Sequence, residues 1–152
     1  MQNPIAALRS QRGITLLELM IVVVIIAIIA SFGYPSYMRY VVNTKRTAAT
    51  TMLLQVADRQ QQFFMDNKRY AADLTNLGFA GSPLWVSDEG QSVPAGDADA
   101  IYILSVVNVT PTSYTALAAP LGSQLERDTK CGTMTLNQAG ARGALGGGDG
   151  CW

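Results

Sequence analysis

The chain has 152 residues with 11 basic and 11 acidic side chains, so its formal net charge is zero. This length suits one modest domain, and the balanced charge gives no global electrostatic reason to expect a nucleic-acid partner. The sequence contains no histidine, which removes the commonest general base and the commonest metal ligand. Two cysteines, Cys131 and Cys151, cannot by themselves form a four-ligand zinc site. With no nucleophile–base pair and no cofactor fingerprint, we expect a protein that is not an enzyme and that holds no cofactor or metal.

A short cationic segment opens the chain, and a long apolar segment follows it. Residues 1–13 carry two arginines and are similar to the positive n-region of an export signal. From Ile14 to Ala30 only Thr15 and Glu18 are polar, and the aromatic residues that come next lengthen the run. The run is just long enough to span a bilayer, and the arginines before it place the N-terminus in the cytoplasm.

Glu18 is the feature of this segment that needs an explanation. A carboxylate at the centre of a membrane helix costs roughly 2.5–3.5 kcal/mol on insertion scales, so a retained one indicates a function and a partner. No neighbouring residue supplies that partner, so we look for it on another molecule. The alternative is an ordinary signal peptide cut near Ala27 to Ser31. Its apolar core would normally be shorter and free of acids, and here the helical pattern continues beyond the cut.

The next segment, residues 36–66, has the pattern of an amphipathic helix. It contains no glycine or proline, and its apolar residues recur at three, four or seven positions. Pro35, close to Gly33, should kink the helix rather than end it. We therefore expect one kinked helix from residue 14 to residue 66, about 80 Å long at 1.5 Å per residue. Its apolar half, residues 14–35, should protrude from the folded domain.

Turn signals and then strand patterns fill the rest of the chain. Residues 67–100 read as a connecting loop, with a short helical turn at Ala71 to Leu77. Three strands are predicted after it, and they comprise Ile101–Val109, Ser113–Ala119 and Gly132–Asn137. A helix followed by consecutive strands predicts an α+β fold with an antiparallel sheet packed on the amphipathic half of the helix. The tail at Gly140–Gly150 is glycine-rich and flexible by composition.

Several short patterns have an ordinary structural explanation. Gly146 to Gly148 lack the Lys-Ser/Thr of a phosphate loop. The acids of residues 88–99 do not match an EF-hand, so solvated loop acids are favoured over a calcium site. Two basic pairs, Lys45–Arg46 and Lys68–Arg69, are assigned to a solvated helix face rather than to DNA contacts. The cysteines are expected to form a disulfide if the domain is exported, and to stay free in cytosol.

Taken together, residues 12–30 and the helix after them resemble the type IV prepilins. The resemblance rests on the leader ending in Gly13, the Thr15-Leu16-Leu17-Glu18 core and the apolar run. Pro35 matches the helix-kinking proline of that family. Cys131 and Cys151 match the disulfide that bounds the C-terminal region called the D-region in that family, here within residues 101–152. The stretch from Arg69 to Gly78 and the ending Asp149-Gly150-Cys151-Trp152 are most similar to PilE-type minor pilins.

The resemblance implies a role for each of these positions. Prepilin peptidase would cut between Gly13 and Ile14 and then N-methylate Ile14, although phenylalanine is the usual first mature residue. Glu18 would act in assembly and methylation, pairing with the new amine of a neighbouring subunit and setting the axial register. Before assembly the chain would cross the inner membrane once with its globular domain in the periplasm, and afterwards it would lie in the pilus at the cell surface.

The function expected is therefore structural. We predict a minor pilin that primes a type IV pilus or is incorporated into it, for adhesion and twitching motility. Its partners would be other pilins, the peptidase and the inner-membrane assembly platform. The alternatives are a major pilin, a DNA-uptake pilin that binds DNA at the cell surface, and a secretion-system pseudopilin, which the C-terminal disulfide disfavours.

Overall fold

A computed structural model describes residues 13–152, so the predicted leader, apart from Gly13, lies outside the described residues. The chain divides into two compact units, and the division falls between Met38 and Arg39. One long helix, α1 (Leu16–Asn67), runs from the first unit into the second. Pro35 lies inside α1, so the proline does not end the helix, as the sequence predicted.

In the first unit, α1 presents apolar side chains in every direction. Its large hydrophobic residues from Leu16 to Phe32 are between 48% and 78% exposed. The helix is long and apolar enough to cross a membrane by length and composition. An apolar surface of this size on a single chain needs lipid or another protein to cover it.

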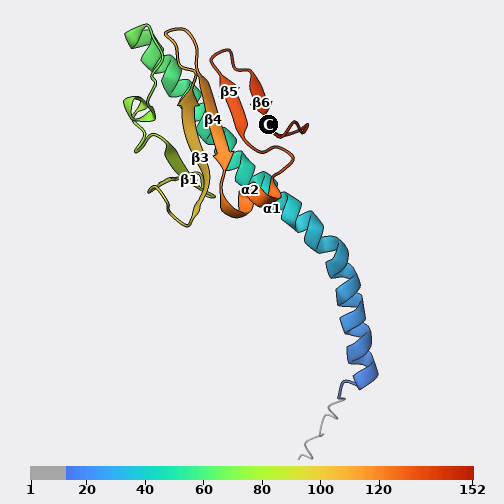
Figure 1. Ribbon diagram of the computed structural model, residues 1–152. Helices are drawn as coiled ribbons and strands as arrows, with labels where there is room; N and C mark the ends of the chain where they lie inside the picture. Colours follow the sequence, from blue (N-terminus) through green and yellow to red (C-terminus); the bar gives the residue numbers. More distant parts are fainter. Residues whose placement is uncertain (1–12) are drawn as a thin grey trace, which may run out of the picture. The chain divides into compact units, whose positions relative to one another are not determined.

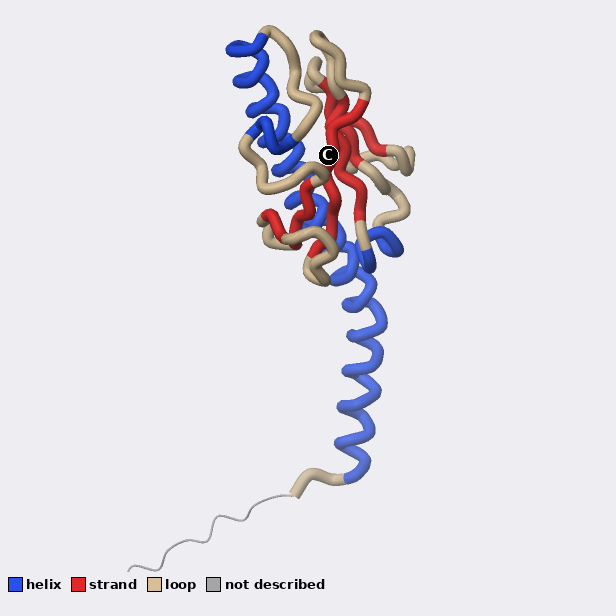
Figure 2. Tube along the Cα trace, turned by 60° about the vertical axis from the view of Figure 1, so that its left-hand side comes forward, coloured by secondary structure: helices blue, strands red, loops and turns tan. Residues whose placement is uncertain are grey.

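The second unit is built on one antiparallel sheet, with the order β2-β1-β3-β4-β5-β6. Its strands are β1 (Leu84–Ser87), β2 (Ser92–Val93), β3 (Ala100–Val107), β4 (Thr115–Pro120), β5 (Met134–Asn137) and β6 (Arg142–Ala144). Two short helices complete the unit, the 3-10 helix η1 (Leu74–Leu77) and α2 (Gly122–Arg127). The second half of α1 lies along one face of the sheet (Figure 1). Figure 2 shows the strands of this sheet next to the same half of the helix.

Helical and strand periodicity together build the core. Ala49, Leu53 and Val56 recur on one face of α1 and are buried, as their spacing predicted. Along β4 and β5 every second residue is buried, which turns one face of the sheet toward α1. The sheet residues in this core are Leu84, Val86, Ile101, Tyr102, Leu104, Ala116, Ala118, Met134 and Leu136. The predicted α+β fold with an antiparallel sheet on the helix is confirmed.

The sheet is larger than the sequence predicted. The three expected strands correspond to β3, β4 and β5, with shifted ends. Two further strands, β1 and β2, lie inside the segment assigned to a loop, and α2 was not predicted. The tail assigned to a flexible region contains β6. These elements are two to six residues long, too short for a period to be recognised, and their strands are defined by pairing with distant segments.

Candidate functional site

The predicted cleavage site lies just before the first turn of α1. Gly13 and Ile14 are exposed and non-helical, and an added Cβ at Gly13 would meet nothing within 4 Å. Thr15 is the N-cap, because its hydroxyl oxygen accepts a hydrogen bond from the Glu18 N–H at 3.1 Å. The bond between Gly13 and Ile14 therefore lies outside the helix.

Glu18 occupies the third helical position, and its side chain is exposed. Thr15 and Glu18 have the spacing of a capping box, a local signal that the sequence interpretation missed. The first turn also favours a negative charge, since the N-terminus of the helix dipole is positive. Among residues 13–152 no ion pair includes Glu18. Its position thus has a local reason, while its charge remains without a partner in this part of the chain.

Pro35 lacks the N–H that would bond to the carbonyl of Ser31, so it weakens one turn of α1. The hydroxyl of Ser31 itself donates to the Ile28 carbonyl at 2.7 Å. An added Cβ at Gly33 would meet nothing within 4 Å. The predicted kink at Pro35 stays a prediction.

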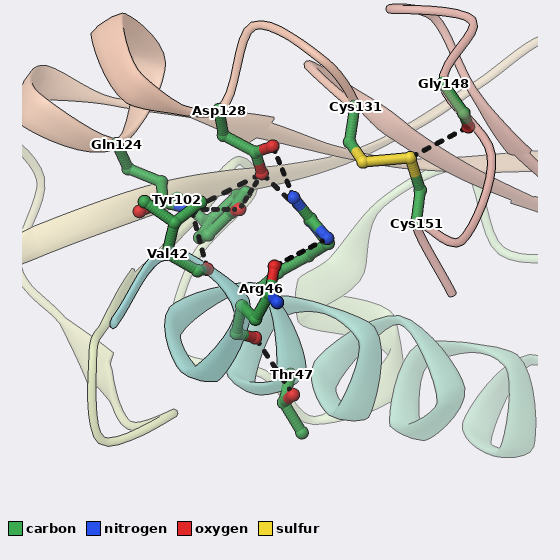
Figure 3. A network of polar contacts seen from close by, with 10 residues as sticks. Val42, Arg46, Thr47, Tyr102, Gln124, Asp128, Cys131, Gly148 and Cys151 are labelled. Atoms are coloured by element: carbon green, nitrogen blue, oxygen red, sulfur yellow. Dashed lines mark hydrogen bonds and ion pairs between the residues drawn. A yellow bond between two sulfur atoms is a disulfide. The ribbon is translucent and has the colours of Figure 1, made fainter. Parts of the chain in front are cut away.

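A buried polar cluster ties α1 to β3 and α2 in the second unit (Figure 3). The Arg46 guanidinium donates to both carboxylate oxygens of Asp128, from Nη2 at 2.6 Å and from Nε at 3.0 Å. The Tyr102 hydroxyl and the Gln124 amide also donate to Asp128, at 3.3 and 3.4 Å, and Gln124 reaches the Val42 carbonyl at 3.2 Å. The assignment of Arg46 to a solvated helix face is therefore wrong. Its partner lies 82 residues away in the sequence, where no local pattern could indicate it.

This cluster shifts the pKa values of Arg46 and Tyr102. The hydrogen bonds from Arg46 to Asp128 raise the pKa of the Arg46 guanidinium, although burial acts against them. Burial raises the pKa of Tyr102 from 10.0 to about 12, so its phenol stays neutral and donates. The charged pair is held by a neutral shell, and no buried side-chain polar atom among the described residues lacks a partner. Through these hydrogen bonds the second half of α1 is joined to β3 and to the end of α2.

The predicted disulfide is present between Cys131 and Cys151, with their Cα atoms 5.6 Å apart. It closes a loop of the C-terminal region that contains β5 and β6. The glycine run beside it is ordered, because Gly146 N–H donates to the Cys131 carbonyl and Gly148 N–H to the Lys130 carbonyl. An added Cβ at Gly146 would come within 2.6 Å of the Lys130 carbonyl oxygen, so glycine is required for this close approach.

The other charged side chains of residues 13–152 include loop acids and several exposed cations. The acids at 88–99 are not buried, and residues 13–152 hold no group of three side chains suited to a metal ion. Lys68 and Arg69 are exposed, as predicted for a solvated pair. Other exposed cations include Arg127, Lys130 and Arg142 in the C-terminal region, where the Arg142 guanidinium lies 5.3 Å from the Trp152 ring.

Sequence comparisons connect these features with known proteins. A family model described as "Type IV minor pilin ComP, DNA uptake sequence receptor" matches residues 35–135, and the "Prokaryotic N-terminal methylation motif" matches residues 8–34. The type IV major pilin protein PilA of Myxococcus xanthus is 39% identical over 69 residues, which are 45% of this chain and 31% of that protein. The type II secretion system core protein G of Dickeya chrysanthemi is 33% identical over 70 residues, 46% of each chain.

A longer match joins the chain to the type IV wide pilus major component PilA4 of Thermus thermophilus, 27% identical over 118 residues, which are 76% of this chain and 78% of that protein. The chain spans less than half the length of the M. xanthus and D. chrysanthemi relatives. The expected minor pilin is supported by the ComP model, whereas the finer likeness to PilE has no counterpart in these matches. Since residues 35–135 are more than half of the 152 residues, the chain belongs to the type IV pilin family, among the minor pilins that the ComP model describes.

Proposed function

We propose that this chain is made as a prepilin, cut between Gly13 and Ile14, and N-methylated on Ile14. Before assembly it spans the inner membrane once, with its N-terminus in the cytoplasm. The assembly platform then moves it into the pilus. There it acts as a minor pilin that primes or joins a fibre used in adhesion and twitching motility. The observation that carries the proposal is the exposed apolar half of α1, in which Glu18 joins no ion pair within residues 13–152. The proposal is also supported by the two family models, which match the N-terminal motif and residues 35–135.

The chemistry of assembly follows from cleavage. Hydrolysis of the Gly13–Ile14 bond creates a cationic amine, and one methyl group leaves it cationic. In a filament core this amine meets the Glu18 carboxylate of a neighbouring subunit. In low dielectric such a pair is strongly attractive, whereas either charge alone is costly to bury. Head-to-tail contacts whose rotation does not close into a ring build a helical filament.

Replacement of the carboxylate by its neutral isostere tests this proposal. In Glu18→Gln the chain should insert in the membrane as well as the wild type or better, while its amount in sheared pili should fall at least tenfold. The matched control is Glu126→Gln, which neutralises an exposed carboxylate on α2 and should leave that amount unchanged. Normal incorporation of Glu18→Gln would show that the pairing argument is wrong.

A second candidate function is DNA capture during uptake, which the description of the ComP model favours. The exposed Arg127, Lys130 and Arg142 are cations able to contact phosphates. The full mature chain in detergent should then bind duplex DNA with an affinity that falls steeply with salt. Lys130→Gln should weaken binding and lower the salt slope by about one unit per lost contact, whereas Lys45→Gln should not. Absence of binding at low salt excludes this function and leaves the pilus role intact.

A further inference from the structure

The exposed aromatic residues of α1 within the first unit follow an order that matches the outer boundary of a membrane. Phe32, Tyr34 and Tyr37 are 76%, 67% and 64% exposed. The apolar run ends with Phe32, which has no hydroxyl, and the two tyrosines come after it. Tyrosine and tryptophan rings are enriched at the interface of a bilayer, and a tyrosine ring places its hydroxyl on the aqueous side, whereas a phenylalanine ring has no polar group to place there.

The helix length agrees with this position. From Leu16 to Tyr34 there are 18 helical steps, or about 27 Å at 1.5 Å each. Ile14 and Thr15 precede the helix, so the mature amine lies a few ångströms beyond its end. The hydrocarbon core of a bilayer is about 30 Å thick. A chain with its amine at the inner boundary therefore reaches the outer boundary at Tyr34.

We propose that Phe32, Tyr34 and Tyr37 form a collar that binds the outer phospholipid interface of the inner membrane. This collar fixes how deeply the chain sits in the membrane before it is assembled into a pilus. The proposal rests on the membrane-spanning state described under the proposed function. Phe32 lies about 3 Å inside Tyr34 along the helix, and Tyr37 about 4.5 Å outside it. The apolar ring thus faces acyl chains and the outermost hydroxyl faces headgroups.

The collar also sets the depth of Glu18. Sixteen helical steps, or about 24 Å, separate it from Tyr34, so Glu18 lies only about 6 Å inside the inner boundary of a 30 Å core. Side chains on a helix tilt toward its N-terminus, which here directs the carboxylate to the cytoplasmic interface. At this depth the Glu18 carboxylate is tolerated while the chain spans the membrane before assembly. When the helix moves outward during assembly, the Glu18 carboxylate approaches the bilayer centre, where an unpaired charge is costly. At this step the amine of a neighbouring subunit is required as its partner.

Depth-dependent quenching of tryptophan fluorescence tests the collar. The full mature chain carrying Tyr34→Trp is placed in phosphatidylcholine vesicles with bromines either near the glycerol end or near the methyl end of the acyl chains. The wild-type signal of Trp85 and Trp152 is subtracted. Tyr34→Trp should be quenched at least twofold more by the shallow bromines. The control Val24→Trp lies ten residues, about 15 Å, deeper and should show the reverse order.

The outcomes separate the two proposals. If Val24→Trp is quenched by the deep bromines and Tyr34→Trp is not quenched preferentially by the shallow ones, the chain spans the membrane and the collar is overturned. If neither tryptophan is quenched, the membrane-spanning state itself fails.

Moving the acid provides a second measurement of depth. Glu18→Gln should insert normally. Glu18→Gln combined with Val22→Glu carries the acid about 6 Å deeper, so it should lower the inserted-to-uninserted ratio several-fold. An equal ratio would contradict the assigned depth.

Discussion

Removing the Arg46 side chain should destabilise the second unit more than any change at a surface lysine or arginine. In Arg46→Met the Asp128 carboxylate, which is 1% exposed, loses both of its short hydrogen bonds. Only the donors from Tyr102 and Gln124 remain, at 3.3 and 3.4 Å. A buried charge that loses its partner typically costs about 3–5 kcal/mol. That is a large fraction of the ~5–15 kcal/mol that stabilises an ordinary domain.

Urea unfolding of the full mature chain in detergent measures this loss, with near-ultraviolet circular dichroism as the signal from the folded unit. The control is Lys45→Met, which removes the half-buried neighbouring cation and should change the free energy of unfolding by less than about 0.5 kcal/mol. The double variant Arg46→Met with Asp128→Leu removes both charges and should be more stable than Arg46→Met alone. The reasoning is refuted if Arg46→Met costs no more than the control, or if the double variant is no more stable than Arg46→Met alone.

Three further predictions use the same measurement of unfolding. The Gln60 side chain donates to the Ala71 carbonyl at 2.7 Å and accepts from the Ala71 N–H at 2.9 Å. Gln60→Met should therefore lower the free energy of unfolding by about 2–4 kcal/mol, whereas Gln61→Met, at an exposed position, should change it little. Equal losses in the two variants would contradict this role. Gly146→Ala forces a methyl group against backbone atoms and should cost about 1–3 kcal/mol, so an unchanged midpoint would argue against the close approach. Burial, with the nearby phenol of Tyr70, raises the pKa of Tyr114 from 10.0 to about 12. The contribution of Tyr114 to stability should therefore be constant below pH 10 and fall between pH 10 and 12. Tyr114→Phe should reduce that fall, and an identical pH profile in this range would be evidence against it.

The sequence predicted the parts of this molecule that local patterns determine. The apolar run, the amphipathic half of α1 and the strands β3, β4 and β5 all carry a period over several residues. The disulfide between Cys131 and Cys151 followed from the family resemblance rather than from geometry. Thr15 and Glu18 carried a capping-box signal that was present in the sequence but was not used.

The parts that were missed depend on contacts between distant segments. β1, β2 and β6 are two to four residues long and exist because a neighbouring strand pairs with them. Arg46 follows Lys45 in a polar stretch, and two adjacent basic residues of this kind usually indicate a solvated helix face, which is why its burial was not predicted. Its burial is explained only by Asp128, which the fold brings against it from 82 residues away.

The central claim, that this chain is a processed pilus subunit, is tested most directly by mass spectrometry of sheared pili. We expect to find the chain there, at low abundance, with its N-terminus at Ile14 and one methyl group on the terminal nitrogen. A mature N-terminus near Ser31, or absence of the chain from pili that are otherwise intact, would contradict the account.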